Sequence, residues 1–400
     1  MLTFNYTARD TATNKIVKGV IQADSENAAA KLLMAQHIVP TKITAADKEG
    51  GLKAFGSRVS TKDRVIFTRQ LATMINAGLP LAQSLNTVEE QTSNKALKQI
   101  VGGVIGDING GMSLADAFSK YPKVFNQVFI ALVRAGETSG TLDKSLERLA
   151  NQQEHDADML SKIRGAMVYP AIVLAVIIFV VGFMLITLVP QVEILYNDMN
   201  KELPGTTKIL VALANFFMTF WYLVLAVLIG SIILLKRWID TESGRKTWDS
   251  IKLNMPMFSP LFRKLYMARF SRTAETLLAS GVPLLETLKI CSDAVNNAVV
   301  KEEILRATQK VKNGKPLSEA LSGEEYILKF VPQMTKIGEQ SGGIDAMLGK
   351  VADYYEKEVD NAIKAISTTI EPILMVVMAG MIGFIVIAVL MPIYSLSGET

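Results

Sequence analysis

Histidine and cysteine are nearly absent from this chain of 400 residues, which contains two histidines and a single cysteine, Cys291. A single cysteine excludes an intramolecular disulfide. Three such residues in total are also too few for an ordinary structural zinc site, which takes four ligands, mostly of these two types. The sequence therefore predicts no metal site.

Motifs for nucleotide binding and for hydrolysis are missing as well. No stretch matches GxxxxGK[ST], the loop that cradles phosphates, and none matches GxSxG, the nucleophile elbow of serine hydrolases. The formal net charge of +4 gives little electrostatic basis for nucleic-acid binding. The start, MLTFNYTARD, lacks the features of a signal peptide, so we expect no cleaved leader. Nucleotide binding is disfavoured, and any energy must come from a partner.

Charge is absent from three long segments, 167–189, 209–235 and 373–391. A helix needs about 20 apolar residues to cross the hydrocarbon core of a bilayer, so each segment is predicted to be a transmembrane helix. The second is the longest, and a tilt or an end outside the core absorbs its extra length. We expect Pro190 and Pro392 to end the first and third spans, and no span to be broken at mid-membrane.

The charges beside the spans predict their orientation. Lys236 and Arg237 directly follow the second span. The loop expected at 190–208 has more acidic than basic residues: Glu193, Asp198 and Glu202 against Lys201 and Lys208. Basic flanks stay in the cytoplasm. We therefore expect the N-terminus and the segment between the second and third spans to be cytoplasmic, and the loop 190–208 and the tail 392–400 to be external.

The sequence is duplicated internally. Pro170 and Pro372 are 202 positions apart, as are Pro190 and Pro392. At nearly the same offset, GLPL at 78–81 recurs as GVPL at 281–284, and GETSG at 136–140 recurs as GEQSG at 338–342. We interpret the chain as two parallel copies, each a helical bundle followed by an outward span. The second span then returns the chain to the cytoplasm before the second copy begins.

The remaining segments are assigned from periodicity and helix breakers. Residues 1–45 predict a small α/β module, with strands at 2–8, 15–23 and 38–43 and a helix that contains AAAKLLMAQ at 28–36 and is capped by Ser25. Residues 46–60 are polar and rich in glycine, which is typical of a linker. Residues 61–164 and 257–364 each predict a cytoplasmic bundle of about six short helices. The predicted fold class is mainly α and integral to the membrane.

Four side chains in the repeated motifs are candidate partner contacts: Arg69, Arg272, Glu137 and Glu339. For the arginines, the alternative is hydrogen bonding to helix-end carbonyls within the same bundle. For the glutamates, the alternative is a plain helix connection, in which glycine supplies a positive φ and Ser or Thr caps the next helix. We favour the internal role for both pairs.

Two acidic trios also recur: Glu154, Asp156 and Asp158, then Glu356, Glu358 and Asp360. Carboxylates four residues apart share a helix face, so these trios are candidates for cation binding or acid–base chemistry. However, Lys162 follows Asp158 by four residues, and Lys364 follows Asp360 in the same way. This spacing favours a solvated, ion-paired helix that leads to the membrane.

Several longer motifs resemble the type II secretion system F family. In the first copy these are FTRQLATMINAGLPL at 67–81, LVRAGETSGTLDKSLERLA at 132–150 and YPAIVL at 169–174, and related motifs recur in the second copy. The resemblance covers essentially the whole chain. It implies a platform protein of type IV pili or type II secretion systems in the bacterial inner membrane, without an enzymatic activity or cofactor.

The same resemblance implies a set of partners. These are a cytoplasmic hexameric ATPase, pilin or pseudopilin subunits, other inner-membrane assembly proteins, membrane lipid and further copies of the chain, but no nucleic acid. The platform would couple the ATPase motor to insertion and extraction of pilin subunits.

Two other classes stay open on the residues alone. A membrane transporter or channel subunit is disfavoured because only three spans are expected, without charge or breaks inside them. Substrate flux into liposomes would support that class. A membrane enzyme is disfavoured because no recognisable catalytic set is present.

Overall fold

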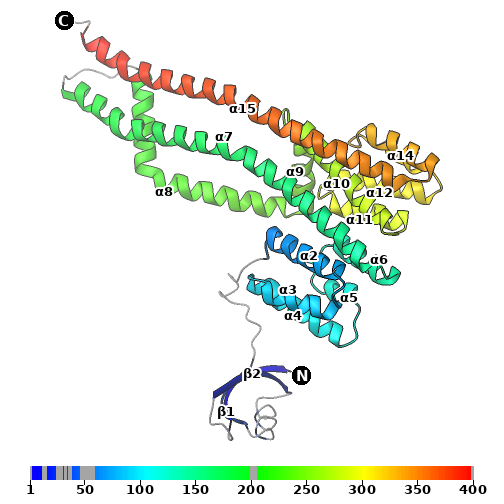
Figure 1. The fold of residues 1–400 in the computed structure, drawn as a ribbon. Helices are drawn as coiled ribbons and strands as arrows, with labels where there is room; N and C mark the ends of the chain where they lie inside the picture. The colour runs from blue at the N-terminus through cyan, green and yellow to red at the C-terminus, as the bar shows by residue number, and fades with distance from the viewer. Residues whose placement is uncertain are drawn as a thin grey trace. The chain divides into compact units, whose positions relative to one another are not determined.

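The computed structural model of the protein describes residues 2–10, 16–23, 30, 34, 38–45, 59–198 and 205–397. At the N-terminus, three antiparallel strands form a sheet in the order β2-β1-β3: β1 Leu2–Asp10, β2 Ile16–Ala23 and β3 Ile38–Ala45 (Figure 1). The helix expected between β2 and β3 lies mostly outside the described residues, of which Ala30 and Met34 are helical. The α/β character of this module therefore stays a prediction.

Pro40 lies within strand β3, which is an edge strand of the sheet. Proline has no N–H to donate, so it is tolerated in edge strands and at bulges. The register with β1 shifts at this point, since Thr7 is opposite Lys42 but Ala8 is opposite Pro40. The strand therefore continues past the proline to Ala45.

The first repeat consists of short helices followed by one very long helix. They are α2 Thr61–Asn76, α3 Leu81–Gln91, α4 Lys95–Asn109, α5 Leu114–Ser119, α6 Gln127–Ser139 and α7 Leu142–Asp198. Helix α6 ends at Gly140, whose φ of 70° is left-handed and accessible to glycine at little cost.

The second repeat has the same order of helices. They are α10 Ser259–Ala279, α11 Leu284–Ala294, α12 Ala298–Lys312, α13 Leu317–Ser322, α14 Phe330–Ser341 and α15 Ile344–Ser397. An additional helix, α9 Glu242–Asn254, precedes the expected start at residue 257 and contacts α10 and α12. Its buried Asp249 accepts a hydrogen bond from the backbone N–H of Ala298 at 2.8 Å. The packed unit thus begins earlier than the duplication alone indicates.

The core of the first repeat is a cluster of four phenylalanines that are at most 1% exposed: Phe67, Phe118, Phe125 and Phe129. Their ring centroids are 4.5 to 6.2 Å apart, which is the favoured range for aromatic pairs. In the second repeat, buried Leu321 takes the sequence position equivalent to Phe118. The two repeats share a helix plan but fill their cores differently.

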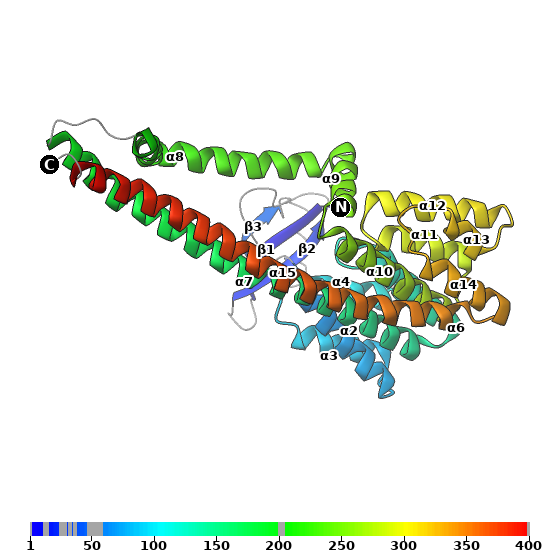
Figure 2. The same cartoon turned by 90° about the horizontal axis from the view of Figure 1, so that it is seen from above.

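Helices α7 and α15 each run without interruption from a bundle into an apolar span, and they lie side by side (Figures 1 and 2). The helices do not end at Pro190 and Pro392, because both prolines lie inside helices, and the ends of the spans stay a prediction. Residues 190–198 are helical, so the loop expected at 190–208 is shorter. A proline removes one backbone hydrogen bond, and membrane helices accommodate that loss by local adjustment.

Helix α8, Gly205–Ile239, is broken at Phe220, where φ is −111° and ψ is 21°. Figures 1 and 2 show its two segments running in different directions. The expectation of an unbroken second span is therefore wrong. No proline or glycine lies at the break, so no local feature of the sequence indicates it.

Within the part of the chain that the structure describes, three helices are long and apolar enough to cross a membrane: Leu142–Asp198, Ala214–Ile239 and Ile344–Ile387. Large apolar side chains face outward along them, and Phe179 and Val376 are each 72% exposed. Such a surface is stable in lipid but not in water. These helices confirm the prediction of three apolar membrane segments.

Candidate functional site

Arg69 on α2 is bound by several side chains of α7. Its guanidinium donates to both carboxylate oxygens of Glu154 at 2.6 Å, to Glu147 at 2.7 Å and to Asn151 at 2.5 Å. A planar guanidinium suits such paired contacts with carboxylates. We call these four residues the Arg69 cluster. It holds α2 against the part of α7 that precedes the apolar segment.

The hydrogen bonds from Arg69 also lower the pKa of Glu154 below its ordinary value of 4.5. A carboxyl whose pKa is lowered on folding adds stability above its unfolded pKa and loses that contribution as the pH falls through its folded pKa. We expect Glu154→Gln to destabilise the protein at pH 6, and the difference from wild type to shrink below about pH 4.5. Thermal unfolding in detergent across this pH range measures it.

A double-mutant comparison controls for other groups that titrate in the same range. In an Arg69→Gln background, Glu154→Gln is expected to have little further effect at any pH, because the shared interaction is already lost. A difference between wild type and E154Q that persisted unchanged at pH 3 would contradict this explanation.

Arg272 on α10 forms the corresponding cluster with α15. Its guanidinium donates to Glu356 at 2.9 Å and to Asp353 at 2.5 Å. Burial lowers the pKa of Arg272, but the hydrogen bonds with these two carboxylates outweigh burial and raise it. We call these three residues the Arg272 cluster. Glu356 also lies 3.4 Å from Nδ1 of His155, which comes from the first repeat.

The two repeats contact each other through polar groups of α7 and α10. Arg148 donates to the carbonyl of Ala279 and, at 3.2 Å, to the hydroxyl of Ser280. The amide of Gln152 donates to Thr273 at 2.8 Å in a buried position. Buried polar groups strongly favour the one arrangement in which they are paired, so these contacts fix how the repeats pack.

The acidic trios are ion-paired, as the spacing predicts, but the pairs include residues of the other repeat. Lys162 bridges Asp158 and Asp360 at 2.9 Å each, so Asp360 pairs across the repeats rather than with Lys364. Glu358 pairs with Lys264 at 2.7 Å. Asp156 lies 3.8 Å from Arg269 of the second repeat. Each trio therefore contributes to contact between helices.

Glu137 and Glu339 cap short helices. Glu137 accepts from the backbone N–H groups of Leu114 at 2.8 Å and Ala115 at 3.2 Å, at the start of α5. Glu339 accepts from Leu317 N–H at 2.5 Å, at the start of α13. The first N–H groups of a helix lack partners within the helix, and a carboxylate there also interacts favourably with the helix dipole.

The glycines of the same motifs allow a close approach of helices. A Cβ added at Gly136 would lie 2.7 Å from Cβ of Ser145, and one at Gly338 would lie 2.8 Å from Cα of Ile344. Both distances are shorter than van der Waals contact. The GETSG and GEQSG motifs thus have an internal structural explanation, and contact of their glutamates with a partner stays a prediction.

The ion pairs and hydrogen bonds of the Arg69 and Arg272 clusters hold helices together. Within the described residues, no three His, Cys, Asp or Glu side chains are grouped so that they would hold a metal ion. Burial raises the pKa of the Cys291 thiol, which packs in the core. Arg69 and Arg272 bond to carboxylates instead of the helix-end carbonyls that the sequence analysis considered.

An apolar groove lies between the membrane helices. It has a volume of about 620 Å³ and is lined by α7, α8 and Met381 of α15. Trp221 and Met218, on either side of the break at Phe220, contribute to its wall. On the same helix pair, Val189 packs with Val211 and Ala214. The groove thus lies beside the break, on the apolar surface of these helices.

The contacts across the repeats involve residues that the sequence analysis missed, notably Arg148, Gln152 and Thr273. The signal in the sequence that could have indicated such residues is a difference in residue type between equivalent positions of the two copies. Gln152 of the first copy corresponds to Tyr354 of the second. Thr273 of the second copy corresponds to Gln70 of the first. The two residues of this buried contact, Gln152 and Thr273, therefore both differ from their equivalents in the other copy.

This architecture defines a multi-pass membrane protein built from two homologous helical repeats. The family model described as "Type II secretion system (T2SS), protein F" matches residues 67–190 and 270–392, and that of its N-terminal domain matches residues 1–44. The chain therefore belongs to the type II secretion system protein F family.

Similar proteins match along nearly their entire length. The type IV pilus assembly protein PilC of Thermus thermophilus is 37% identical over 100% of this chain and 99% of that protein. The PilC of Myxococcus xanthus is 35% identical, over 97% and 94%. The type II secretion system protein F of Vibrio cholerae is 34% identical, over 99% of each.

Proposed function

We propose that this chain is an inner-membrane platform for assembly of a type IV pilus or a type II secretion pseudopilus. The observation that carries this proposal is full-length similarity to PilC and protein F relatives, with both repeats and the N-terminal domain matched. The chain acts by binding and transmitting movement, without an enzymatic reaction of its own.

In the proposed topology, the N-terminal module and both six-helix bundles lie in the cytoplasm and the end of the chain lies outside. Lys236 and Arg237 at the end of α8 support this orientation, because basic residues beside a span stay on the cytoplasmic side. Bundle 61–164 then leads outward through α7, and bundle 257–364 leads outward through α15.

The proposed partners are a cytoplasmic hexameric ATPase and pilin or pseudopilin subunits, with other inner-membrane assembly proteins, lipid and further copies of the chain around them. The unbroken α7 and α15 support this mechanism, since movement of a bundle displaces the attached span. We expect the membrane helix of a pilin to contact the spans at the apolar groove beside Phe220, because its lining is apolar.

Co-purification tests the function. We expect the full-length chain, extracted in mild detergent, to retain both the cognate pilus or secretion ATPase and the major pilin. An unrelated multi-pass membrane protein with the same tag is the control and is expected to retain neither. Folded protein that bound neither partner would contradict the platform function.

The break in α8 is the one observation that favours a transporter, because broken membrane helices form substrate sites in many transporters. However, the residues that line the groove beside the break are apolar or glycine, without an ionisable side chain. Transport of a charged or polar substrate would need such groups. Flux of amino acids or ions into liposomes that contain the chain would favour this second function.

A further inference from the structure

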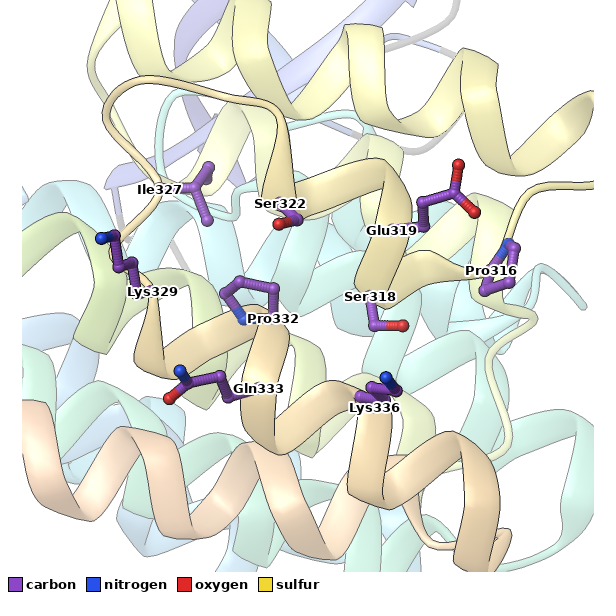
Figure 3. Close-up of a pocket in the computed structure, with 9 residues that line it drawn as sticks. All are labelled: Pro316, Ser318, Glu319, Ser322, Ile327, Lys329, Pro332, Gln333 and Lys336. Atoms are coloured by element: carbon purple, nitrogen blue, oxygen red, sulfur yellow. The ribbon is translucent and has the colours of Figure 1, made fainter.

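A second groove lies on the soluble part of the second repeat, between helices α13 and α14. It has a volume of about 520 Å³. Figure 3 shows Ser318 and Ser322 on the α13 side, and Pro332, Gln333 and Lys336 on the α14 side. Pro332 and Ile327 are buried and give the groove an apolar floor, whereas its rim is polar.

Two cations on this rim form no ion pair with any residue that the structure describes. Lys329 and Lys336 line the groove, both are exposed, and neither forms an ion pair within residues 59–198 and 205–397. The nearby carboxylate of Glu319 is paired with Lys315 at 2.7 Å, and in Figure 3 it points away from α14. The groove therefore presents positive charge around an apolar floor.

The first repeat provides an internal comparison. Arg134 is the equivalent of Lys336, and Asp116 is the equivalent of Glu319. There the two residues bond to each other at 2.9 Å and link α5 to α6. The residue before α6 is Asn126, whose side chain caps the helix by accepting from Phe129 N–H at 3.0 Å, whereas Lys329 before α14 makes no such cap. The first repeat uses these positions to link and cap its helices, whereas Lys329 and Lys336 of the second repeat form no ion pair with the described residues.

We propose that the groove between α13 and α14 binds an acidic segment of the assembly ATPase, so that the second repeat is the one that meets the motor. This inference rests on the proposed function for the choice of partner. Carboxylates of the segment would pair with Lys329 and Lys336, and an apolar side chain between them would cover Pro332 and Ile327.

The spacing of the lysines defines the segment further. Seven residues of helix rise separate Lys329 from Lys336, which is about 10 Å at 1.5 Å per residue. An extended chain of the polyproline II type advances about 3.1 Å per residue with three residues per turn, so carboxylates three positions apart lie on the same face and roughly match this separation. The fitting motif is an extended segment with acidic residues at positions 1 and 4 and an apolar residue between them.

Charge reversal tests the proposal. In full-length protein reconstituted in nanodiscs, K329E/K336E is expected to weaken ATPase binding at least tenfold, because two attractive contacts become repulsive. The control variant K312E/K350E changes the net charge of the same repeat equally, at exposed lysines outside the groove, and is expected to change affinity less than twofold. Unfolding midpoints of both variants show whether they remain folded.

A photo-crosslinking residue at Gln333, in an otherwise unaltered chain, supplies a second measurement. We expect a crosslink to the ATPase at a segment with the acidic spacing given above. Equal ATPase affinity of wild type and K329E/K336E, or a crosslink to lipid or to a second copy of this chain, would overturn the groove assignment and leave the platform function intact. Absence of ATPase binding by the wild-type chain would overturn both.

Discussion

Replacing Phe118 by alanine is expected to lower the stability of the first repeat by about 3–5 kcal/mol, the usual cost of removing a buried phenylalanine. Phe118 is fully buried and its ring contacts Phe67, Phe125 and Phe129, with centroids 4.5 Å apart for the closest pair. The cavity left behind is lined by aromatic rings that cannot close over it. Circular dichroism during heating, together with limited proteolysis within residues 61–164, measures the loss.

The second repeat supplies the control for this change. Leu321 occupies the equivalent position and is itself fully buried. Phe118→Leu therefore inserts a residue that the same helix plan already accommodates, and it retains most of the apolar volume. We expect it to cost clearly less than the alanine variant. Equal destabilisation by leucine and alanine would show that aromatic ring contacts, rather than the filled volume, stabilise this core.

The second large effect is expected for Gly338→Ala, which should cost about 1–3 kcal/mol through overpacking. The added Cβ would lie 2.8 Å from Cα of Ile344 and 3.2 Å from the carbonyl oxygen of Gly343. Both are backbone atoms, so relief requires α14 and α15 to separate. Because Glu339 caps α13 from the adjacent position, that separation also disturbs the cap. The unfolding midpoint in detergent reports the change.

Gly106→Ala is the matched control, because a Cβ at Gly106 would meet no atom within 4 Å. Alanine is favoured over glycine inside a helix by roughly 0.5–1 kcal/mol, so this variant is expected to be neutral or slightly stabilised. If Gly338→Ala behaved like Gly106→Ala, the close approach of α14 and α15 would not be a requirement of the fold.

The membrane segments and the duplication could be predicted from the sequence because their signals are long. A charge-free segment of bilayer length identifies a span without knowledge of its neighbours. The ends of the spans could not be predicted in the same way. Pro190 removes only its own N–H from the backbone hydrogen bonds of the helix. The surrounding apolar residues keep α7 helical through Asp198. Phe220 carries no local breaking signal, and Phe216 packs 5.4 Å from its ring.

The internal role of the candidate site residues could be predicted from the sequence, but the residues with which they pair could not. An internal role for Arg69 was the favoured interpretation, yet its partners are Glu147 and Glu154 on a helix about 80 positions later. A sequence does not give distances between such remote positions. Contacts between the repeats are even harder to predict. Lys162 and Asp360 pair with each other, although the spacing of each predicts a pair with a neighbour on its own helix.

The unbroken α7 and α15 also explain where the two copies are allowed to differ in length. The offset between them changes from 203 to 202 before Gly136 and Gly338, and it then stays constant through Pro190 and Pro392. One residue added within either long helix would rotate everything beyond it by about 100°, at 3.6 residues per turn. The missing residue instead lies before the motif glycines, upstream of these helices. The rotation of the lipid-facing side of each long helix relative to its bundle is therefore the same in both copies.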